Sequence, residues 1–216
     1  MRTDFQKRDS KEYNLLRSIF QKITCSWVYG FYYRVVYNLK IVGRENVPKN
    51  GFCIVASNHI SAIDPFLVVH AVGRNLAFMA KKELFENKIS SFFLDLLGAF
   101  AVNREKLSPS TIKTAHALKK TNWCLWIFPQ GTREQDGNIS NVSKGFASLA
   151  KTLKCDIIPV AITGMTKDER KVFNGHMKIT IGKPIPFNDN VEEMVTVWNN
   201  KINELCEGNW YEIRKC

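Results

Sequence analysis

The stretch FCIVASNHISAIDPF, residues 52–66, decides the fold that the sequence predicts. Its first part is a short apolar run, which is typical of a buried strand. Its end is typical of a helix start, because Pro65 suits the first position of a helix and Asp64 suits the cap before it. The stretch therefore predicts a strand, a tight turn and a helix in immediate succession.

His59 and Asp64 lie within this predicted turn. Two residues five apart on one helix differ in direction by about 140°, so their side chains would diverge. A strand-to-helix turn can bring them together instead. An imidazole suits proton transfer near neutral pH, and a carboxylate on one ring nitrogen fixes the tautomer and stabilises the imidazolium. The pair has the parts of a His–Asp dyad. The alternative is that Asp64 only caps the helix and His59 is an ordinary turn residue.

From residue 41 onward, short apolar runs alternate with stretches of helical periodicity. We predict strands at residues 52–57, 76–80, 99–102, 124–128, 156–162 and 176–182, and helices at residues 65–72, 83–97, 109–121, 143–153 and 191–206. This alternation predicts an α/β fold with a central, mostly parallel or mixed sheet flanked by helices. Residues 41–216 would form one domain.

Residues 1–40 differ from the rest. Apolar and aromatic side chains recur at helical spacing through residues 12–40, interleaved with Arg17, Lys22, Arg34 and Lys40. Residues 1–44 carry nine Lys and Arg against three Asp and Glu. This pattern predicts an amphipathic helix or helical hairpin that lies at a membrane interface, with cations among the lipid headgroups. The alternative is an amphipathic helix packed on the protein's own core. The longest uncharged run, residues 23–33, is far shorter than the ~20 residues that span a bilayer.

The formal net charge of +11 indicates an anionic partner: a nucleic acid, an anionic membrane or a phosphorylated substrate. None of the six cysteines forms a C-x-x-C pair, so we expect reduced thiols in a cytosol-facing protein. No cleavable signal peptide is expected, because the first twelve residues are rich in charge. The sequence has no recognised nucleic-acid motif, so a nucleic-acid partner is not expected.

Basic residues follow several of the predicted strands. Arg104 ends GAFAVNR, Arg133 lies in FPQGTRE, and Lys81 follows LAFMA. Ligand sites in α/β sheets gather beyond the carboxyl ends of strands, and guanidinium groups suit phosphate. Gly131 would let a backbone amide approach an anion or an oxyanion closely. Each cation alone is more simply a solvated surface charge, but together they predict a site for an anion.

A serine hydrolase is a rival interpretation of the His59 turn. No G-x-S-x-G elbow is present, and the only serines close in sequence are Ser57 and Ser61. A hydroxyl supplied by the substrate would instead make the dyad part of a transferase.

The stretch NHISAIDPF resembles the H-x-x-x-x-D block of the glycerolipid acyltransferases. The blocks AKKELF, GAFAVNR, FPQGTR, KGFASLA and IIPVAITG follow in that family's order and at its usual separations. The match covers about residues 41–187. The chain is most similar in these blocks to the 1-acylglycerol-3-phosphate acyltransferases, enzymes of phospholipid biosynthesis that make phosphatidic acid.

The resemblance implies a role for each matching residue. His59 would be the general base and Asp64 its orienting partner. The substrate phosphate would be held by Arg104, Arg133 and Lys81. The loop of Gln130, Gly131 and Thr132 would lie near the acceptor and the oxyanion, and Pro159 would line the acyl-donor side. Two positions depart from the family pattern: Gln130 replaces a glutamate and Asn103 replaces an aspartate, which puts the acceptor in doubt.

The resemblance also implies the reaction and its setting. A thioester donor, acyl-CoA or acyl carrier protein, would acylate the free hydroxyl of 1-acylglycerol 3-phosphate without a metal or redox cofactor. A related acyltransferase with another acceptor, such as glycerol 3-phosphate or an aminolipid, is the main alternative. Residues 41–216 would be the catalytic domain. Residues 1–40 would associate with an anionic membrane at its cytoplasmic face, in a peripheral or monotopic manner.

Overall fold

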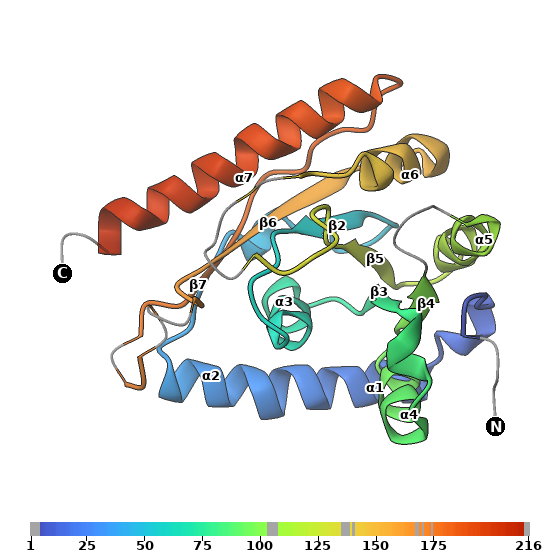
Figure 1. Cartoon of the computed structure of the whole chain (residues 1–216), viewed down its shortest axis with the longest axis horizontal. Coiled ribbons are helices and arrows are strands. Elements are labelled where there is room, and N and C mark those ends of the chain that lie inside the picture. Colours follow the sequence, from blue (N-terminus) through green and yellow to red (C-terminus); the bar gives the residue numbers. More distant parts are fainter. Residues whose placement is uncertain are drawn as a thin grey trace.

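The computed structural model describes residues 5–102, 108–134, 139, 141–166, 169, 171–173 and 175–213, the last six as backbone only. A central sheet separates two layers of helices. Figure 1 shows helix α7 along the upper edge and the N-terminal helices along the lower edge, with the sheet between them. The α/β fold predicted from the sequence is confirmed.

Seven strands form one mixed sheet in the order β1-β7-β6-β2-β5-β3-β4. All neighbouring pairs are parallel except β6 and β7, which are antiparallel. The strands are β1 (Lys40–Val42), β2 (Ile54–Ser57), β3 (Leu76–Lys81), β4 (Phe100–Val102), β5 (Cys124–Ile127), β6 (Ile157–Thr163) and β7 (Lys178–Ile181). Six of them match the predicted strands, and β1 was not predicted.

The helices also follow the prediction, with one break. They are η1 (Ser10–Glu12), α1 (Leu15–Lys22), η2 (Ile23–Gly30), α2 (Phe31–Val36), η3 (Arg44–Asn46), α3 (Asp64–Val72), η4 (Lys82–Phe85), α4 (Lys88–Leu96), α5 (Pro109–Leu118), α6 (Gly145–Leu153) and α7 (Val191–Ile213). The predicted helix 83–97 is split into η4 and α4. The split occurs because the Asn87 side chain accepts hydrogen bonds from the backbone N–H groups of Ile89 and Ser90, which starts a new helix.

Each face of the sheet has its own apolar core. One core contains Trp126 and Val55 and is covered by α3, with η4 and the end of α4 at its margin. The other contains Ala56 and Trp198 and is covered by α5, α6 and α7. The Trp198 indole N–H donates to the Ala56 carbonyl over 3.1 Å, so α7 is fixed at one point on the sheet. The two layers leave the strand ends as the place for a site.

The N-terminal segment is one nearly continuous helical run, α1–η2–α2, and not the hairpin that the sequence also allowed. Its middle, η2, is a π-helix that packs on α3. A Cβ atom on Gly30 would lie 2.5 Å from His70 Cγ, so only glycine fits this contact without a shift. The inner side of the run therefore packs on the protein's own core. Its outer side is apolar and exposed, which the interfacial interpretation requires.

The described cysteines are all buried free thiols, as predicted, and Cys216 lies outside the described residues. Within the described ranges, no helix has both the length and the apolar character that crossing a bilayer requires.

Candidate active site

The site forms along the side of the sheet where five parallel strands have their carboxyl-terminal ends; this side is called the strand edge below. The His59 turn follows β2, and the loop of residues 128–134 follows β5, its neighbour in the sheet. Strand β3, next to β5, ends at Lys81, and Lys81 pairs with Val102 at the end of β4. The topology therefore gathers the predicted site residues that follow β2, β3 and β5 at the strand edge, as expected for an open α/β sheet.

The turn between β2 and α3 brings His59 and Asp64 together, as the spacing predicted. The Nδ1 atom of His59 lies 2.8 Å from Oδ2 of Asp64. That oxygen also accepts hydrogen bonds from the backbone N–H groups of Ile60 (2.7 Å) and Ser61 (2.9 Å). Three donors on one oxygen fix the carboxylate, and a neutral imidazole that donates from Nδ1 keeps Nε2 as its acceptor.

Asp64 begins helix α3 and does not cap it, so the predicted cap is wrong. The cap position is Ile63, with Pro65 in the first turn. The Asp64 side chain turns back toward the preceding loop, and the residue is completely buried. A carboxylate in the first turn is stabilised by the helix dipole, which adds to its hydrogen bonds. The side chain that the sequence offered for a cap is used to hold His59.

Phe128 fixes the plane of the His59 ring, and the sequence analysis did not identify it. The two rings are stacked, with centroids 3.6 Å apart and planes at 14°. Trp126, two residues earlier, packs on Phe128 at 4.4 Å. The available signal was the alternation of bulky aromatic side chains on one face at the end of β5. This stack covers one face of the imidazole and restricts its rotation.

Gln130 and the loop around it support the same turn. Its Oε1 accepts the backbone N–H of His59 over 3.2 Å, and the residue is buried. The backbone N–H of Glu134 donates to the His59 carbonyl over 2.9 Å. Both groups of His59's main chain are thus held by the loop after β5. The acceptor role of Gln130 needs a carbonyl oxygen and no charge, so the departure from glutamate leaves this contact possible.

Gly131 has a positive φ of 70°, and its N–H donates to the Phe128 carbonyl over 3.0 Å. That amide is therefore engaged within the turn. The predicted oxyanion contact from this loop would therefore come from a backbone amide other than that of Gly131.

The structure describes some of the residues predicted to bind the phosphate and to line the acceptor loop, but not all of them. Arg133, Thr132 and Lys81 are exposed at this edge of the sheet. Thr132 Oγ1 lies 3.4 Å from Glu134 Oε1. Arg104 and Asn103 lie outside the described residues. The structure thus brings Lys81 and Arg133 to the edge where His59 lies.

Pro159 is buried in β6 and pairs with Ala56 of β2. Its ring faces Gly182 on the α7 side of the sheet, whereas Phe128 and Trp126 belong to the opposite layer. The structure does not bring the Pro159 side chain to His59.

Ser57 does not have the surroundings of a nucleophile. It is completely buried, and its Oγ accepts the indole N–H of Trp126 over 3.0 Å. Asn58, which the sequence analysis did not single out, joins the end of β2 to β6: its amide exchanges hydrogen bonds of 2.8 and 2.7 Å with the main chain of Ile162. Both residues brace the start of the turn.

Comparisons with known proteins identify the family. The profile of the family described as Acyltransferase matches residues 38–163. The chain is 32% identical over 176 residues to a 1-acyl-sn-glycerol-3-phosphate acyltransferase of Bacillus subtilis, covering 77% of this chain and 87% of that one. It is 34% identical over 158 residues to an enzyme of the same name from Streptococcus pneumoniae, covering 70% of this chain and 58% of that one.

A solved structure shares the fold. The crystal structure of the 1-acyl-sn-glycerophosphate acyltransferase from Thermotoga maritima superposes with a TM-score of 0.66 at 23% identity, over 89% of this chain and 78% of that one. The family profile covers more than half of the chain. The chain therefore belongs to the acyltransferase family that includes the 1-acyl-sn-glycerol-3-phosphate acyltransferases, and it is an acyltransferase.

Proposed function

We propose that this acyltransferase transfers a fatty acyl group from a thioester to the free hydroxyl of 1-acylglycerol 3-phosphate, giving phosphatidic acid. The observation that carries the proposal is the buried His59–Asp64 pair at the strand edge where Lys81 and Arg133 are exposed. The names of the relatives support the acceptor, because they are 1-acyl-sn-glycerol-3-phosphate acyltransferases.

The proposed reaction is a single displacement at the thioester carbonyl. With Nδ1 of His59 bonded to Asp64, Nε2 accepts the proton of the lipid hydroxyl as its oxygen attacks the carbonyl carbon. Asp64 stabilises the imidazolium that forms. The carbon–sulfur bond then breaks, and the imidazolium returns the proton to the leaving thiolate. The products are an ester and a free thiol, and no metal or redox cofactor takes part.

The remaining site residues take the charges of the substrate. Lys81 and Arg133 would bind the glycerol phosphate, with Arg104 as a further candidate from the adjacent strand end. A backbone amide of the loop after β5, other than that of Gly131, would stabilise the oxyanion. Pro159 would act on the donor side only through the packing of β6, since its ring faces α7.

A related reaction with another acceptor, glycerol 3-phosphate or an aminolipid, was suggested by the replacement of glutamate with Gln130. This replacement is a weak reason to expect another acceptor, because the side-chain carbonyl of Gln130 accepts a hydrogen bond from the His59 main chain and needs no charge to do so. We therefore favour lysophosphatidate.

The proposed setting is the surface of an anionic membrane at its cytoplasmic face. Apolar and aromatic side chains are exposed on the outer side of α1–η2–α2, and Lys22 and Arg34 are exposed among them; Lys40, at the start of β1, is also exposed. Arg17 differs from the prediction, because its guanidinium is paired with Asp95. Aromatic rings at the acyl boundary and cations among the headgroups are typical of interfacial helices.

A matrix of donors and acceptors tests the proposal. Purified protein in detergent is given acyl-CoA or acyl-loaded carrier protein together with lysophosphatidate, glycerol 3-phosphate or a lyso-aminolipid, and the products are identified by mass spectrometry. We expect phosphatidic acid as the main product with at least one donor. Faster acylation of either other acceptor would contradict the proposed substrate, and the better donor would distinguish coenzyme A from carrier protein.

A further inference from the structure

Helix α4 exposes an apolar face that nothing in the described structure covers. Ile89, Phe92 and Phe93 are 71%, 54% and 50% exposed, and their spacing places them on one face of the helix. Leu84, in the preceding η4, is also exposed. A soluble surface rarely gathers large apolar side chains in this way without a binding role.

The inward face of α4 is already occupied. Ser91 is buried, and Leu94 packs against the core that contains Trp126. Asp95, near the end of α4, accepts contacts from two guanidinium groups: Arg8 Nη1 at 2.6 Å and Arg17 Nη2 at 2.5 Å. The exposed face therefore cannot turn inward without breaking these contacts.

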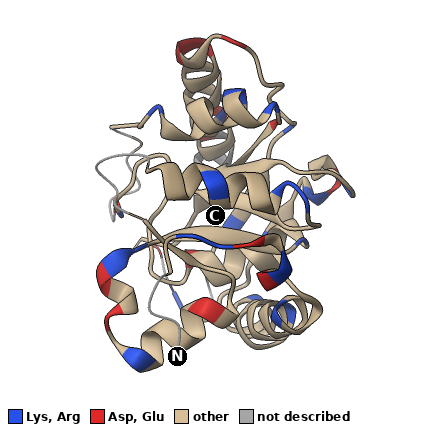
Figure 2. Cartoon of the chain, turned by 90° about the vertical axis from the view of Figure 1, so that its right-hand side faces the viewer, with Lys and Arg blue, Asp and Glu red and all other residues tan. Residues whose placement is uncertain are grey.

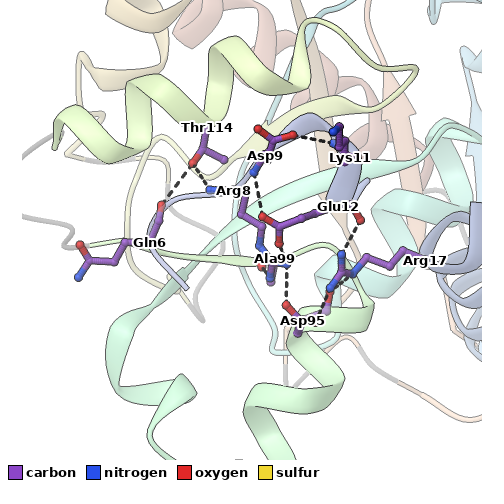
Figure 3. Close-up of polar contacts among 9 residues, drawn as sticks. All are labelled: Gln6, Arg8, Asp9, Lys11, Glu12, Arg17, Asp95, Ala99 and Thr114. Atoms are coloured by element: carbon purple, nitrogen blue, oxygen red, sulfur yellow. Dashed lines mark hydrogen bonds and ion pairs between the residues drawn. The ribbon is translucent and has the colours of Figure 1, made fainter. Parts of the chain in front are cut away.

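These ion pairs connect α4 to the N-terminal segment (Figure 3). Arg8 has a fully buried side chain that also donates to the Ala99 carbonyl and lies 3.4 Å from Glu12. Arg17, in α1, donates from Nε to the Asp95 carbonyl over 3.1 Å. Removing one partner of such a buried cluster is costly, so the cluster holds α1 and α4 in a defined arrangement.

The two elements that carry the apolar faces are neighbours. Helices α1 and α4 contact each other, and in Figure 1 α4 lies at the lower right, at the α1 end of the long N-terminal helical run, with the sheet above both. The orthogonal view in Figure 2 again shows the η4–α4 stretch and the N-terminal helix side by side at the lower edge. The N-terminal part of this surface includes Trp27, which is 75% exposed, and Phe31.

The stretch before α4 is positive overall. Lys81, Lys82 and Lys88 are exposed there together with Glu83 and Glu86, so residues 81–88 carry three positive and two negative charges. Cations beside large aromatic side chains fit an anionic bilayer, where the rings enter the acyl boundary and the cations meet the headgroups. A second protein copy would need like charges to approach one another on a chain of net charge +11.

We propose that α4 inserts its Ile89–Phe92–Phe93 face into an anionic bilayer beside the N-terminal helix, and that the Arg8–Asp95–Arg17 cluster holds the two elements in one plane. The inference rests on the proposed function, since the lipid acceptor would come from the same bilayer. Two fixed elements restrict the tilt of the domain more than one helix can. The strand edge with His59 would then keep a constant orientation toward the lipid surface.

A depth measurement tests the insertion of α4 directly. Phe92→Trp is prepared in a Trp27→Phe background and mixed with phosphatidylglycerol–phosphatidylcholine vesicles that contain brominated acyl chains. Four other tryptophans remain in this background, so the emission of the new indole is the difference from the Trp27→Phe protein measured with the same vesicles. We expect this difference emission to be blue-shifted and quenched at least about twofold. The matched control is Val197→Trp on α7, an exposed apolar position on the opposite edge of the molecule. Quenching of Phe92→Trp no greater than that of the control would overturn the proposal.

A binding measurement gives the second readout. We expect the triple variant Ile89→Ser/Phe92→Ser/Phe93→Ser to bind the same vesicles at least about 100-fold more weakly than wild type, as expected for losing three inserted apolar side chains. Val197→Ser/Phe187→Ser should bind like wild type. Equal binding by the triple variant would overturn the proposal. The proposal would also be overturned if wild type forms a dimer in the absence of lipid and the triple variant, unlike the Val197→Ser/Phe187→Ser control, does not.

Activity in detergent separates this proposal from the proposed function. There the triple variant should keep wild-type turnover, because the reaction site is intact. If wild type has no turnover in detergent, yet the indole of the Phe92→Trp variant is quenched by brominated lipid, the proposed function fails and the membrane-binding surface stands.

Discussion

Replacing Asp64 with asparagine removes the charge that holds His59 and keeps the shape of the side chain. Oδ2 of Asp64 accepts three hydrogen bonds, one from the imidazole and two from the main chain. A hydrogen bond to a charged group contributes about 1.5–3 kcal/mol and a neutral one about 0.5–1.5 kcal/mol. Neutralising the acceptor should therefore lower the free energy of unfolding by about 3 kcal/mol.

The effect on catalysis should be larger than the effect on stability. The asparagine oxygen stays with the two backbone N–H donors and the imidazole, but it carries no charge to stabilise the imidazolium that forms when His59 takes the proton. The corresponding change in a serine protease lowers kcat by about 10⁴. We expect Asp64→Asn to lower kcat by about 10³–10⁴, equivalent to about 4–5.5 kcal/mol in the barrier.

The assay measures single-turnover acyl transfer to lysophosphatidate and thermal unfolding on the same preparation. A loss of 3 kcal/mol corresponds to a fall in Tm of about 6–12 °C for a domain of this size. Asp189→Asn is the matched control, because the Asp189 side chain is 97% exposed and its Oδ1 lies 3.9 Å from Lys151 Nζ. An Asp64→Asn enzyme that keeps more than a tenth of wild-type turnover would refute the assigned role of the carboxylate.

Three further predictions concern the supports of the site. Gln130→Ala should lower the free energy of unfolding, measured in urea, by about 1–3 kcal/mol and should reduce kcat, because the buried His59 N–H loses its acceptor. Gln130→Glu keeps an acceptor oxygen and should keep the wild-type free energy of unfolding; equal free energies of unfolding for the two variants would contradict this. Gly30→Val should lower the free energy of unfolding by about 1–3 kcal/mol, and by less in a His70→Ala background, because the new side chain meets the His70 ring. Burial, helped by Arg44 and Arg34, lowers the pKa of His70 below 6.5, so the unfolded chain binds more protons than the folded one between the two pKa values. Stability should therefore fall as the pH drops below about 6.5, and the wild-type fall in Tm should exceed that of His70→Gln.

Sequence patterns predicted the parts of the fold that arise from local chemistry. Apolar runs such as CLWIF, residues 124–128, mark buried strands because both sides of a central strand are covered. The helix predicted from residue 109 begins there, at Pro109. Strand β1 was missed because Lys40–Val42 is only three residues long and its ends are exposed. The η4–α4 break was missed because it depends on one side chain, that of Asn87.

The site shows the same division between local and distant contacts. His59 and Asp64 are five residues apart, so a turn was enough to predict their meeting. The stack of Phe128 on His59 and the bond from Gln130 join residues about 70 positions apart, and no local pattern encodes such contacts. The pairing of Arg17 with Asp95 is equally distant, which is why Arg17 was assigned to the membrane surface in error.

The central claim is that His59 takes the proton from the lipid hydroxyl, and turnover of His59→Ala measures it most directly. The variant is compared with wild type for conversion of lysophosphatidate to phosphatidic acid, with circular dichroism and Tm as checks that it folds. We expect at least a 100-fold loss of kcat, since a positioned base contributes about 10²–10⁴. A folded His59→Ala enzyme that retains more than a tenth of wild-type turnover would contradict the account.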